Sequence, residues 1–467
     1  MLNELTEVET NLSTEYLLVK SYSLPHCDLH QLQQSDTQAF PFLVESVAVS
    51  DTQTNSNANI AQYSILFAYP KAPLVLSNRE GFDDFQTKFQ ADFNQNKVTI
   101  TSPLPFTGGW FCYFSYDYAQ VVEPSLSLPS SELPLAILTR VACAYIYDHL
   151  NQQLHLVAEV GFEDEFRKMQ TPLGTFSWKN DCFPVNKIEP AFIQEEDEGK
   201  YLAGIEQIKE YILSGDIFQV NLSRLWQVAL EEGKAEFVYA LLRQSNPAPF
   251  AANVYFEDFQ IVSSSPERLV KYDANTNWVE TRPIAGTRKR SECKDEDKAL
   301  VDELINHPKE IAEHIMLIDL ERNDLGRICE VGSVEVNELM SVETYQHVHH
   351  IVSNVRGKLK RGLTPLDVIH AVFPGGTITG CPKIRCMEII AELEQMPREA
   401  YTGSIGYINR DGSMDTNILI RTFMLKNNIA TFRAGAGIVA DSVASNELEE
   451  ARHKAKGLIQ SLQSLLE

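Results

Sequence analysis

The chain has 467 residues, 44% of them hydrophobic and 22% charged, with a formal net charge of −24. This composition is that of an ordinary globular protein, long enough for two or three domains or one large intertwined one. The acidic balance argues against binding to nucleic acid or anionic membranes, because both need basic surfaces. No apolar run approaches the roughly 20 residues of a membrane span, and the acidic N-terminus resembles no signal peptide. We therefore expect a soluble, cytoplasmic protein.

The N-terminal part of the chain predicts mainly β-structure. The polar run at residues 50–59 predicts an exposed loop, and the acidic run before residue 200 predicts a linker. We therefore expect an N-terminal region at residues 1–190 and a second region at 200–467. Short apolar or alternating segments rich in β-branched and aromatic residues predict strands at residues 63–68, 74–76, 98–100, 141–147 and 154–160.

The second region alternates helix and strand patterns without an internal repeat. This mixture predicts an α+β fold with antiparallel sheets and helices outside them. No P-loop or Rossmann glycine pattern occurs, so nucleotide binding is not indicated. Helices are predicted at residues 201–214, 234–244, 295–306, 308–320, 365–372, 382–393 and 446–465, and strands at 218–222, 252–256, 260–263, 269–272, 405–408, 417–424 and 429–434.

Two glutamate pairs share the same spacing in two predicted helices. They are Glu310 with Glu313, and Glu447 with Glu450. Residues i and i+3 share a helix face, so each pair presents two carboxylates side by side. A solvated helix face is the common explanation of such a pair. Binding of a divalent cation is the functional one, since Mg²⁺ takes carboxylate and water oxygens.

The helix predicted at residues 308–320 should have an apolar stripe on one face and end in a turn. Ile311, Ile315 and Ile318 are spaced as a stripe, and both glutamates lie off it. Residues 322–326 predict a charged turn ending in glycine. In the last helix, Asn446 and Glu449 predict a capping box.

The segment before the last helix is rich in small residues. Residues 434–442 (AGAGIVADS) predict a loop whose N–H groups can hold a carboxylate, because small side chains let a ligand approach the backbone. Arg421 ends a predicted apolar strand and offers a fork for a second carboxylate, or is an exposed edge residue. Lys454, four residues after Glu450, forms an exposed ion pair with it or neutralises a bound carboxylate.

Three further segments carry candidate polar groups. Residues 373–383 (FPGGTITGCPK) predict either a tight connection or a ligand loop with Thr377 as donor. His349 and His350 precede an apolar strand, where a histidine either contacts a substrate or is a satisfied core group. Glu267 follows a proline and is a candidate general acid, with an ion pair to a neighbouring arginine, Arg268 or Arg282, as the alternative.

Nine strings occur in the order found in the chorismate-utilising enzymes, and the chain is identified as resembling that family from about residue 201 to its end. The family includes anthranilate synthase component I, aminodeoxychorismate synthase component I, and the isochorismate and salicylate synthases. The resemblance implies a large intertwined two-sheet β sandwich with flanking helices. The strings are GDIFQVNLS, SSSPERLV, TRPIAGT, EIAEHIMLIDLERNDLG, HHIVS, FPGGTITGCPKIRCMEII, GSIGY, MDTNILIRT and AGAGIVADS.

The resemblance also implies a metal and a substrate site. Glu313 and Glu450 correspond to direct Mg²⁺ ligands, with Glu310 and Glu447 nearby or acting through water. The metal would bind the ring carboxylate of chorismate. The implied substrate contacts are Thr287, Thr377, Lys383, Tyr401, Arg421, Gly435, Gly437 and Lys454, with His350 near the C4 hydroxyl.

The implied chemistry favours an ammonia-using branch. Glu267 corresponds to the general acid that helps the C4 hydroxyl leave. Gln219 stands where water-using relatives carry a basic lysine, and glutamine cannot deprotonate water. The motif Pro247–Phe250, together with His349 and other positions, favours formation of 4-amino-4-deoxychorismate, the precursor of p-aminobenzoate and folate. Ala285 favours anthranilate formation, because many enzymes of the first branch have a lysine there.

The resemblance implies partners as well. No GxCxG nucleophile elbow occurs, so ammonia would come from a separate glutamine amidotransferase subunit. Residues 42–46 (FLVES) resemble the family's tryptophan-site motif, which predicts a possible tryptophan pocket at Glu45, Ser46, Pro249 and Phe250. A non-catalytic, tryptophan-binding regulatory relative is the alternative of another class, against which the retained acidic and basic site residues argue.

Overall fold

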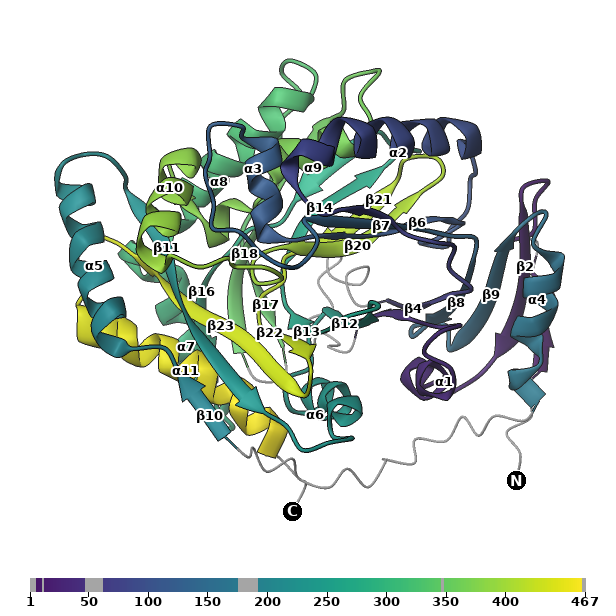
Figure 1. Ribbon diagram of the computed structural model, residues 1–467, viewed down its shortest axis with the longest axis horizontal. Coiled ribbons are helices and arrows are strands. Elements are labelled where there is room, and N and C mark those ends of the chain that lie inside the picture. The colour runs from purple at the N-terminus through teal and green to yellow at the C-terminus, as the bar shows by residue number, and fades with distance from the viewer. Residues whose placement is uncertain (1–5, 11, 47–61, 175–191, 346–347, 464–467) are drawn as a thin grey trace.

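Two large antiparallel sheets make up the computed structural model, with helices on their outer sides (Figure 1). The structure describes residues 6–10, 12–46, 62–174, 192–345 and 348–463. Within them, no helix is both long enough and apolar enough to cross a membrane. The seven cysteines that fall in these ranges are free thiols. The loop expected at residues 50–59 lies outside the described residues.

The first sheet has 13 strands. In spatial order they are β1 (Thr6–Val8), β2 (Leu17–Ser23), β9 (Gln153–Glu159), β8 (Cys143–Asp148), β4 (Tyr63–Ala68), β3 (Phe42–Glu45), β12 (Phe250–Tyr255), β13 (Gln260–Ser265), β22 (Thr422–Lys426), β23 (Ile429–Ile438), β11 (Gln219–Ala229) and β10 (Phe192–Glu195), with β19 (Gly380–Cys381) paired to β11.

The second sheet has 10 strands. Their order is β16 (Ile284–Lys289), β18 (Val348–Lys358), β15 (Trp278–Thr281), β14 (Arg268–Asp273), β21 (Met414–Asn417), β20 (Ser404–Asn409), β6 (Gly109–Phe114), β7 (Ala136–Val141) and β5 (Leu74–Leu76), with β17 (Glu335–Thr344) paired to β18.

Both sheets combine strands from the two ends of the chain. Strand β3 pairs with β12 in the first sheet, and β6 pairs with β20 in the second. The expected α+β fold with two intertwined sheets is therefore confirmed. The division into residues 1–190 and 200–467 stays a prediction about regions of the sequence, since neither sheet is confined to one of them.

An aromatic core holds the sheets together where they face each other. Phe42 of β3 stacks on Phe111 of β6 with ring centroids 4.3 Å apart. Phe67 of β4 meets Phe111 edge to face at 5.3 Å. Residues at alternate positions of each strand point to the same face, so the apolar ones meet in this layer. Offset and edge-to-face aromatic pairs add to the stabilisation from burial alone.

The helices cover the outer faces. Helices α5, α6, α10 and α11 pack on the first sheet, and α8 and α9 pack on the second (Figure 1). The helices are α1 (Leu29–Ser35), α2 (Phe82–Asn96), α3 (Ala119–Val122), α4 (Glu163–Gln170), α5 (Glu198–Leu213), α6 (Val238–Ser245), α7 (Lys294–Asn306), α8 (Pro308–Ile328), α9 (Pro365–Val372), α10 (Lys383–Glu394) and α11 (Ala444–Gln463).

Helix α8 differs from the prediction in its length and its buried face. The expected turn at residues 322–326 is wrong, because the helix continues to Ile328. Asp324, Leu325 and Ile328 are buried two and three turns beyond Leu317 and maintain the helical periodicity. Ile315 is 49% exposed, so the expected isoleucine stripe is not the face that packs on the sheet.

Several strand and cap predictions also fail. The strand expected at 417–424 is interrupted, because β21 ends at Asn417 in the second sheet and β22 begins at Thr422 in the first. Residues 434–438 of the expected glycine loop belong to β23. Residues 98–100 form no strand. Asn446 lies inside α11, which begins at Ala444, and therefore does not cap it.

Candidate active site

A buried carboxyl group marks the centre of the candidate site. Glu267, between β13 and β14, is 5% exposed and makes no ion pair with any described residue. Burial raises the pKa of its carboxyl to about 8, while the neighbouring Thr377 hydroxyl, the Ile284 N–H and Arg421 lower it in part. Glu267 is therefore protonated near neutral pH.

The alternative expected for Glu267 is wrong. Arg268 instead binds Asp415 at 2.8 Å. Arg282 binds Glu338 at 2.7 Å and also Glu343. Both nearby arginines are therefore occupied by other carboxylates, which leaves Glu267 free to keep its proton.

Arg421 lies in the crossover between the two sheets. Its backbone has a left-handed φ of 51°, a conformation that costs free energy in a residue with a Cβ and often marks functional sites. Its guanidinium forms no hydrogen bond or ion pair with any described residue. Burial lowers its pKa, which Glu267 raises in part. A partly buried guanidinium without a partner is suited to an anionic ligand.

Two histidines in sequence have different roles in the fold. Nδ1 of His350 lies 2.8 Å from the Thr287 hydroxyl, and burial, then Arg421, lowers the pKa of His350 to about 3. His350 is therefore neutral at pH 7. His349 contacts Thr344 at 2.9 Å and Asp297 at 2.9 Å, so it is the satisfied core histidine of the two.

Strand β16 carries Ala285, the position at which the resemblance predicts a lysine for one branch of the family. Ala285 is 9% exposed and pairs with Ile351 of β18. Gly286 follows with φ +80°, and a Cβ there would lie 2.8 Å from Oε2 of Glu310. Thr287 comes next and contacts His350. This short strand therefore connects the lysine position, the histidine and the first glutamate pair.

The two glutamate pairs are brought near each other by α8 and α11. The pKa of Glu313 is raised by burial and, after a partial lowering by Lys309, also by Glu310, Glu447 and Glu450. Such mutual effects require the carboxylates to lie within electrostatic reach of one another. The sequence alone gave no information about this approach, because the pairs are more than 130 positions apart.

Basic groups partly neutralise these pairs. Glu310 accepts from Arg288 at 3.1 Å. Glu450 binds Lys454 at 2.8 Å in an exposed ion pair, which confirms that expected interaction. Lys454 also donates to the carbonyl oxygen of Gly435 at 2.8 Å. The second glutamate pair is thereby connected to the glycine-rich end of β23.

The donor set fits Mg²⁺ in chemistry. Carboxylate oxygens are the ligands that Mg²⁺ prefers, and the raised pKa of Glu313 reflects negative charge that a cation would relieve. Among the described residues, no three histidine, cysteine, aspartate or glutamate side chains already lie close enough to hold an ion. Water and substrate oxygens would therefore supply part of any coordination shell.

The glycines of β23 allow close backbone approach. A Cβ on Gly435 would overlap the carbonyl oxygen of Leu222, and one on Gly437 would overlap the amide of Gln219. The Oε1 atom of Gln219 is buried without a hydrogen bond to any described residue. Gln219 thus lies beside the glycine backbone expected to contact substrate.

Thr377, Lys383 and Tyr401 complete the predicted substrate set. Thr377 Oγ1 is buried and lacks a regular hydrogen bond to any described residue. Tyr401 is partly buried, and its pKa is raised by burial. Lys383 is differently placed, because its ammonium binds Asp324 and the Val372 carbonyl oxygen. The Lys383 ammonium therefore already has partners within the protein and is not free to bind a substrate.

Sequence reasoning missed two buried acids on α8, Glu321 and Asp324. Burial, then Asp324, raises the pKa of Glu321 to about 7, while Lys383 lowers it in part. Glu321 also raises the pKa of Glu267. Helical spacing could have revealed both, because they lie two and three turns beyond the face of Glu310 and Glu313.

A separate cavity of about 400 Å³ lies between the sheets and brings together all four residues predicted for a tryptophan pocket, Glu45, Ser46, Pro249 and Phe250. Ser46 donates to the Pro249 carbonyl oxygen at 2.9 Å. Glu45 is buried and accepts from Tyr239 and from Arg243, the latter at 3.1 Å. The polar groups Glu45 and Ser46 that line the cavity therefore already make hydrogen bonds within the protein.

Comparisons with known proteins identify the family. The model of a chorismate binding enzyme family matches residues 45–460. Aminodeoxychorismate synthase component 1 from Bacillus subtilis is 43% identical over 77% of this chain and 77% of its own length. Anthranilate synthase component 1 from the same organism is 39% identical over 77% of this chain and 74% of its own length.

Solved structures agree with the fold. Anthranilate synthase component I from Streptococcus pneumoniae superimposes with a TM-score of 0.75 and 32% identity, covering 85% of this chain and 92% of that one. The menaquinone-specific isochorismate synthase from Escherichia coli has a TM-score of 0.72 at 18% identity, covering 97% of each chain, and supports the fold alone. The chain therefore belongs to the chorismate-binding enzyme family.

Proposed function

We propose that this protein aminates chorismate with ammonia to give 4-amino-4-deoxychorismate, the first committed step toward p-aminobenzoate and folate. The observation that carries the proposal is the buried, protonated Glu267 beside the unpaired guanidinium of Arg421. An acid and an anion-binding cation together suit a reaction in which a hydroxyl leaves a carboxylate substrate. The similarity to aminodeoxychorismate synthase supports this branch.

Each proposed contact follows from the properties of its side chain. Arg421, Tyr401 and the Gly437 N–H would hold the enolpyruvyl carboxylate. Neutral His350 and the Thr377 hydroxyl would line the ring, because both can form hydrogen bonds without adding charge.

The net reaction balances through Glu267 and ammonia. The C4–O bond of chorismate breaks, and Glu267 gives its proton to the hydroxyl, which leaves as water. Ammonia supplies the new C–N bond and releases a proton, which restores Glu267. Ala285 leaves space for this small nucleophile, so the reaction would proceed without a lysyl adduct.

Mg²⁺ is proposed as the cofactor, and it would neutralise the ring carboxylate. Glu313 and Glu450 would be its direct ligands, with Glu310 and Glu447 nearby or acting through water. Gly435 and Lys454 would lie beside this carboxylate end of the substrate. The metal would thereby explain how a strongly acidic protein accepts a dianion.

Ammonia would come from a separate glutamine amidotransferase subunit. The sequence holds no GxCxG motif for glutamine hydrolysis, and Gln219 cannot act as a base toward water. We expect the isolated chain to use ammonium far better than glutamine. Equal rates with both nitrogen sources would overturn the partner proposal.

Anthranilate synthesis is the second candidate, and Ala285 favours it. Similarity to anthranilate synthases at 39% identity supports it too. Product analysis separates the two reactions. Purified protein is incubated with chorismate, Mg²⁺ and ammonium, before and after addition of a lyase that releases p-aminobenzoate from 4-amino-4-deoxychorismate. Lyase-dependent p-aminobenzoate supports the proposal, whereas fluorescent anthranilate with pyruvate release contradicts it.

Tryptophan is proposed as the possible occupant of the cavity at Glu45 and Ser46. The charged and aromatic lining, with Phe250 among it, suits an amino acid with a large ring. A titration of melting temperature and activity with tryptophan tests this. A rise in melting temperature alone would mean a structural ligand, and a parallel loss of activity would mean feedback regulation.

A further inference from the structure

The buried cluster of Glu394, Arg398 and Arg433 lies directly behind Tyr401. All three side chains are at most 3% exposed. Arg398 holds Glu394 with two parallel bonds, Nε to Oε2 at 2.9 Å and Nη2 to Oε1 at 2.6 Å. Arg433 binds the same carboxylate at 2.9 Å. Burial favours the neutral acid, yet the two guanidiniums outweigh it and lower the pKa of Glu394 to about 2.

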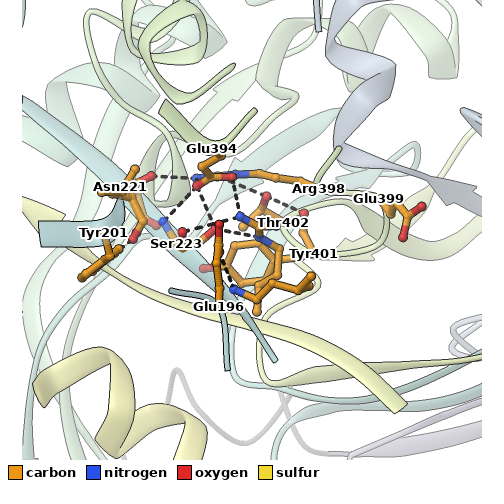
Figure 2. A network of polar contacts seen from close by, with 12 residues as sticks. Glu196, Tyr201, Asn221, Ser223, Glu394, Arg398, Glu399, Tyr401 and Thr402 are labelled. Atoms are coloured by element: carbon orange, nitrogen blue, oxygen red, sulfur yellow. Dashed lines mark hydrogen bonds and ion pairs between the residues drawn. The ribbon is translucent and has the colours of Figure 1, made fainter. Parts of the chain in front are cut away.

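Arg398 joins this cluster to three segments of the candidate site. Its Nη2 donates to the Asn221 carbonyl oxygen on β11 at 2.7 Å. Its Nη1 donates to the Ile378 carbonyl oxygen, next to Thr377, at 3.2 Å. Its guanidinium carbon lies 5.5 Å from the centre of the Tyr401 ring. Figure 2 shows Asn221 on one side of Glu394, and Arg398, Tyr401 and Thr402 on the other.

The turn that presents Tyr401 has a strained backbone. Glu399 and Thr402, on either side of it, have left-handed φ angles of 53° and 62°. Such angles persist only where surrounding contacts hold them. The Arg398 side chain supplies one such contact, since Nη1 lies 3.4 Å from the Thr402 hydroxyl oxygen.

Arg433 differs from Arg398 in the segments to which its side chain is hydrogen-bonded. Among the described residues, the Arg433 side chain donates to Glu394 and to Ser223, with Nε 2.9 Å from the Ser223 Oγ. It therefore secures β11, and none of its hydrogen bonds with the described residues goes to the Tyr401 turn. The cluster also has two guanidiniums for one carboxylate, which leaves one positive charge behind the proposed carboxylate site.

We propose that Arg398 is a positioning residue that fixes Tyr401 and the Thr377 segment for binding of the substrate carboxylate. The inference rests on the proposed function, in which Tyr401 contacts that carboxylate. Lysine at position 398 keeps the charge but cannot make the forked bonds to Glu394 together with the carbonyl contacts. The affinity for the substrate, and not only the stability of the fold, depends on these bonds of Arg398.

The test compares Arg398→Lys with two matched controls in the full chain. Arg433→Lys weakens the bond to Glu394 but removes no hydrogen bond of the Tyr401 turn. Arg140→Lys disturbs another buried forked pair, with Glu159 on β9. Chorismate consumption with saturating ammonium and Mg²⁺ gives kcat and KM, and urea unfolding gives stability. We expect KM for chorismate to rise about tenfold in Arg398→Lys alone, the size of a strong pairwise coupling, while all three variants lose stability.

A double-mutant cycle identifies the residue through which Arg398 acts. If it acts through Tyr401, Arg398→Lys changes KM much less in a Tyr401→Phe background. Additive effects, or a KM in Arg398→Lys equal to that of the controls, would overturn the inference. Should Arg398→Lys not fold, Thr402→Val removes one contact and is expected to raise KM about threefold; an unchanged KM there would also overturn it. A wild type that neither binds nor consumes chorismate would instead refute the proposed function, and the inference with it.

Discussion

Buried Glu267 lies beside the partly buried Arg421, yet the two form no ion pair. Each shifts the pKa of the other, Arg421 lowering that of Glu267 and Glu267 raising that of Arg421. Burial nevertheless has the larger effect on both pKa values, so the acid keeps its proton. The guanidinium donors are free because no described residue accepts a hydrogen bond from them. A closed ion pair would satisfy both groups and leave neither for a substrate. The incomplete pairing is therefore the feature most directly connected with the proposed chemistry.

Glu267→Gln should reduce kcat by about 10²- to 10⁴-fold, the usual contribution of a general acid. The wild-type rate should fall as the pH rises through about 8, where Glu267 loses its proton. Steady-state kinetics between pH 6 and 9.5 measure both effects. A variant that keeps the wild-type rate would show that Glu267 is not the acid.

The same substitution should change the pH dependence of stability. The pKa of Glu267 is raised on folding, so the folded state binds the proton more tightly and its stability falls between about pH 4.5 and 8. Glu267→Gln removes this loss, and its free energy of unfolding relative to wild type should increase toward pH 8.5. Urea unfolding at pH 5 and 8.5 measures it, with exposed Glu330→Gln as the control. A pH-independent difference would contradict the assigned shift.

Glu313→Gln and Glu450→Gln should each abolish stabilisation by Mg²⁺. A ligand at 100 times its Kd stabilises the folded state by about 2.7 kcal/mol, so the wild type should melt at a higher temperature with the metal. Thermal unfolding with and without Mg²⁺ measures this without any substrate. Glu449→Gln, next to Glu450 on α11 and exposed, is the control that should keep the full response. An undiminished response in the first two variants would refute the metal assignment.

Arg421→Met should separate binding from stability. Loss of charge-assisted bonds worth about 1.5–3 kcal/mol would raise KM for chorismate by about 10- to 100-fold. The fold should not lose stability, because the Arg421 guanidinium makes no hydrogen bond or ion pair with any described residue. Arg268→Met is the contrast, since it leaves Asp415 uncompensated and should cost about 3–5 kcal/mol. A comparable loss in Arg421→Met, measured by urea unfolding, would mean a structural role.

Two glycines of β23 should respond differently to alanine. In Gly435→Ala the new Cβ would overlap the backbone carbonyl of Leu222, which cannot move without disturbing the sheet. In Gly437→Ala it would meet only the end of the Gln219 side chain, which can rotate away. We expect the first variant to lose more than about 3 kcal/mol of stability and the second to lose less than 1 kcal/mol but also some activity. Similar losses in both would contradict this.

Patterns along the chain predicted most elements because each depends on local periodicity. The strands at Tyr63–Ala68 and Leu74–Leu76 and the helix Pro365–Val372 match their predicted bounds. The segment at 417–424 failed because its apolar residues serve two sheets in turn, and no local pattern distinguishes a crossover from a strand. The turn expected at residues 322–326 is wrong because Asp324, the buried charge among them, finds its partner Lys383 only in the fold.

The sequence by itself determined the family, the candidate residues and the identical spacing of the two glutamate pairs, because motifs and helical periodicity are properties of neighbouring positions. Tertiary structure alone decided which of these residues meet. It brought α8 near α11, left Arg421 unpaired beside Glu267, bound Lys383 to Asp324, and placed Arg398 behind Tyr401. Burial and the approach of distant charges set these relationships, and both depend on how the two sheets pack and not on the order of residues along either one.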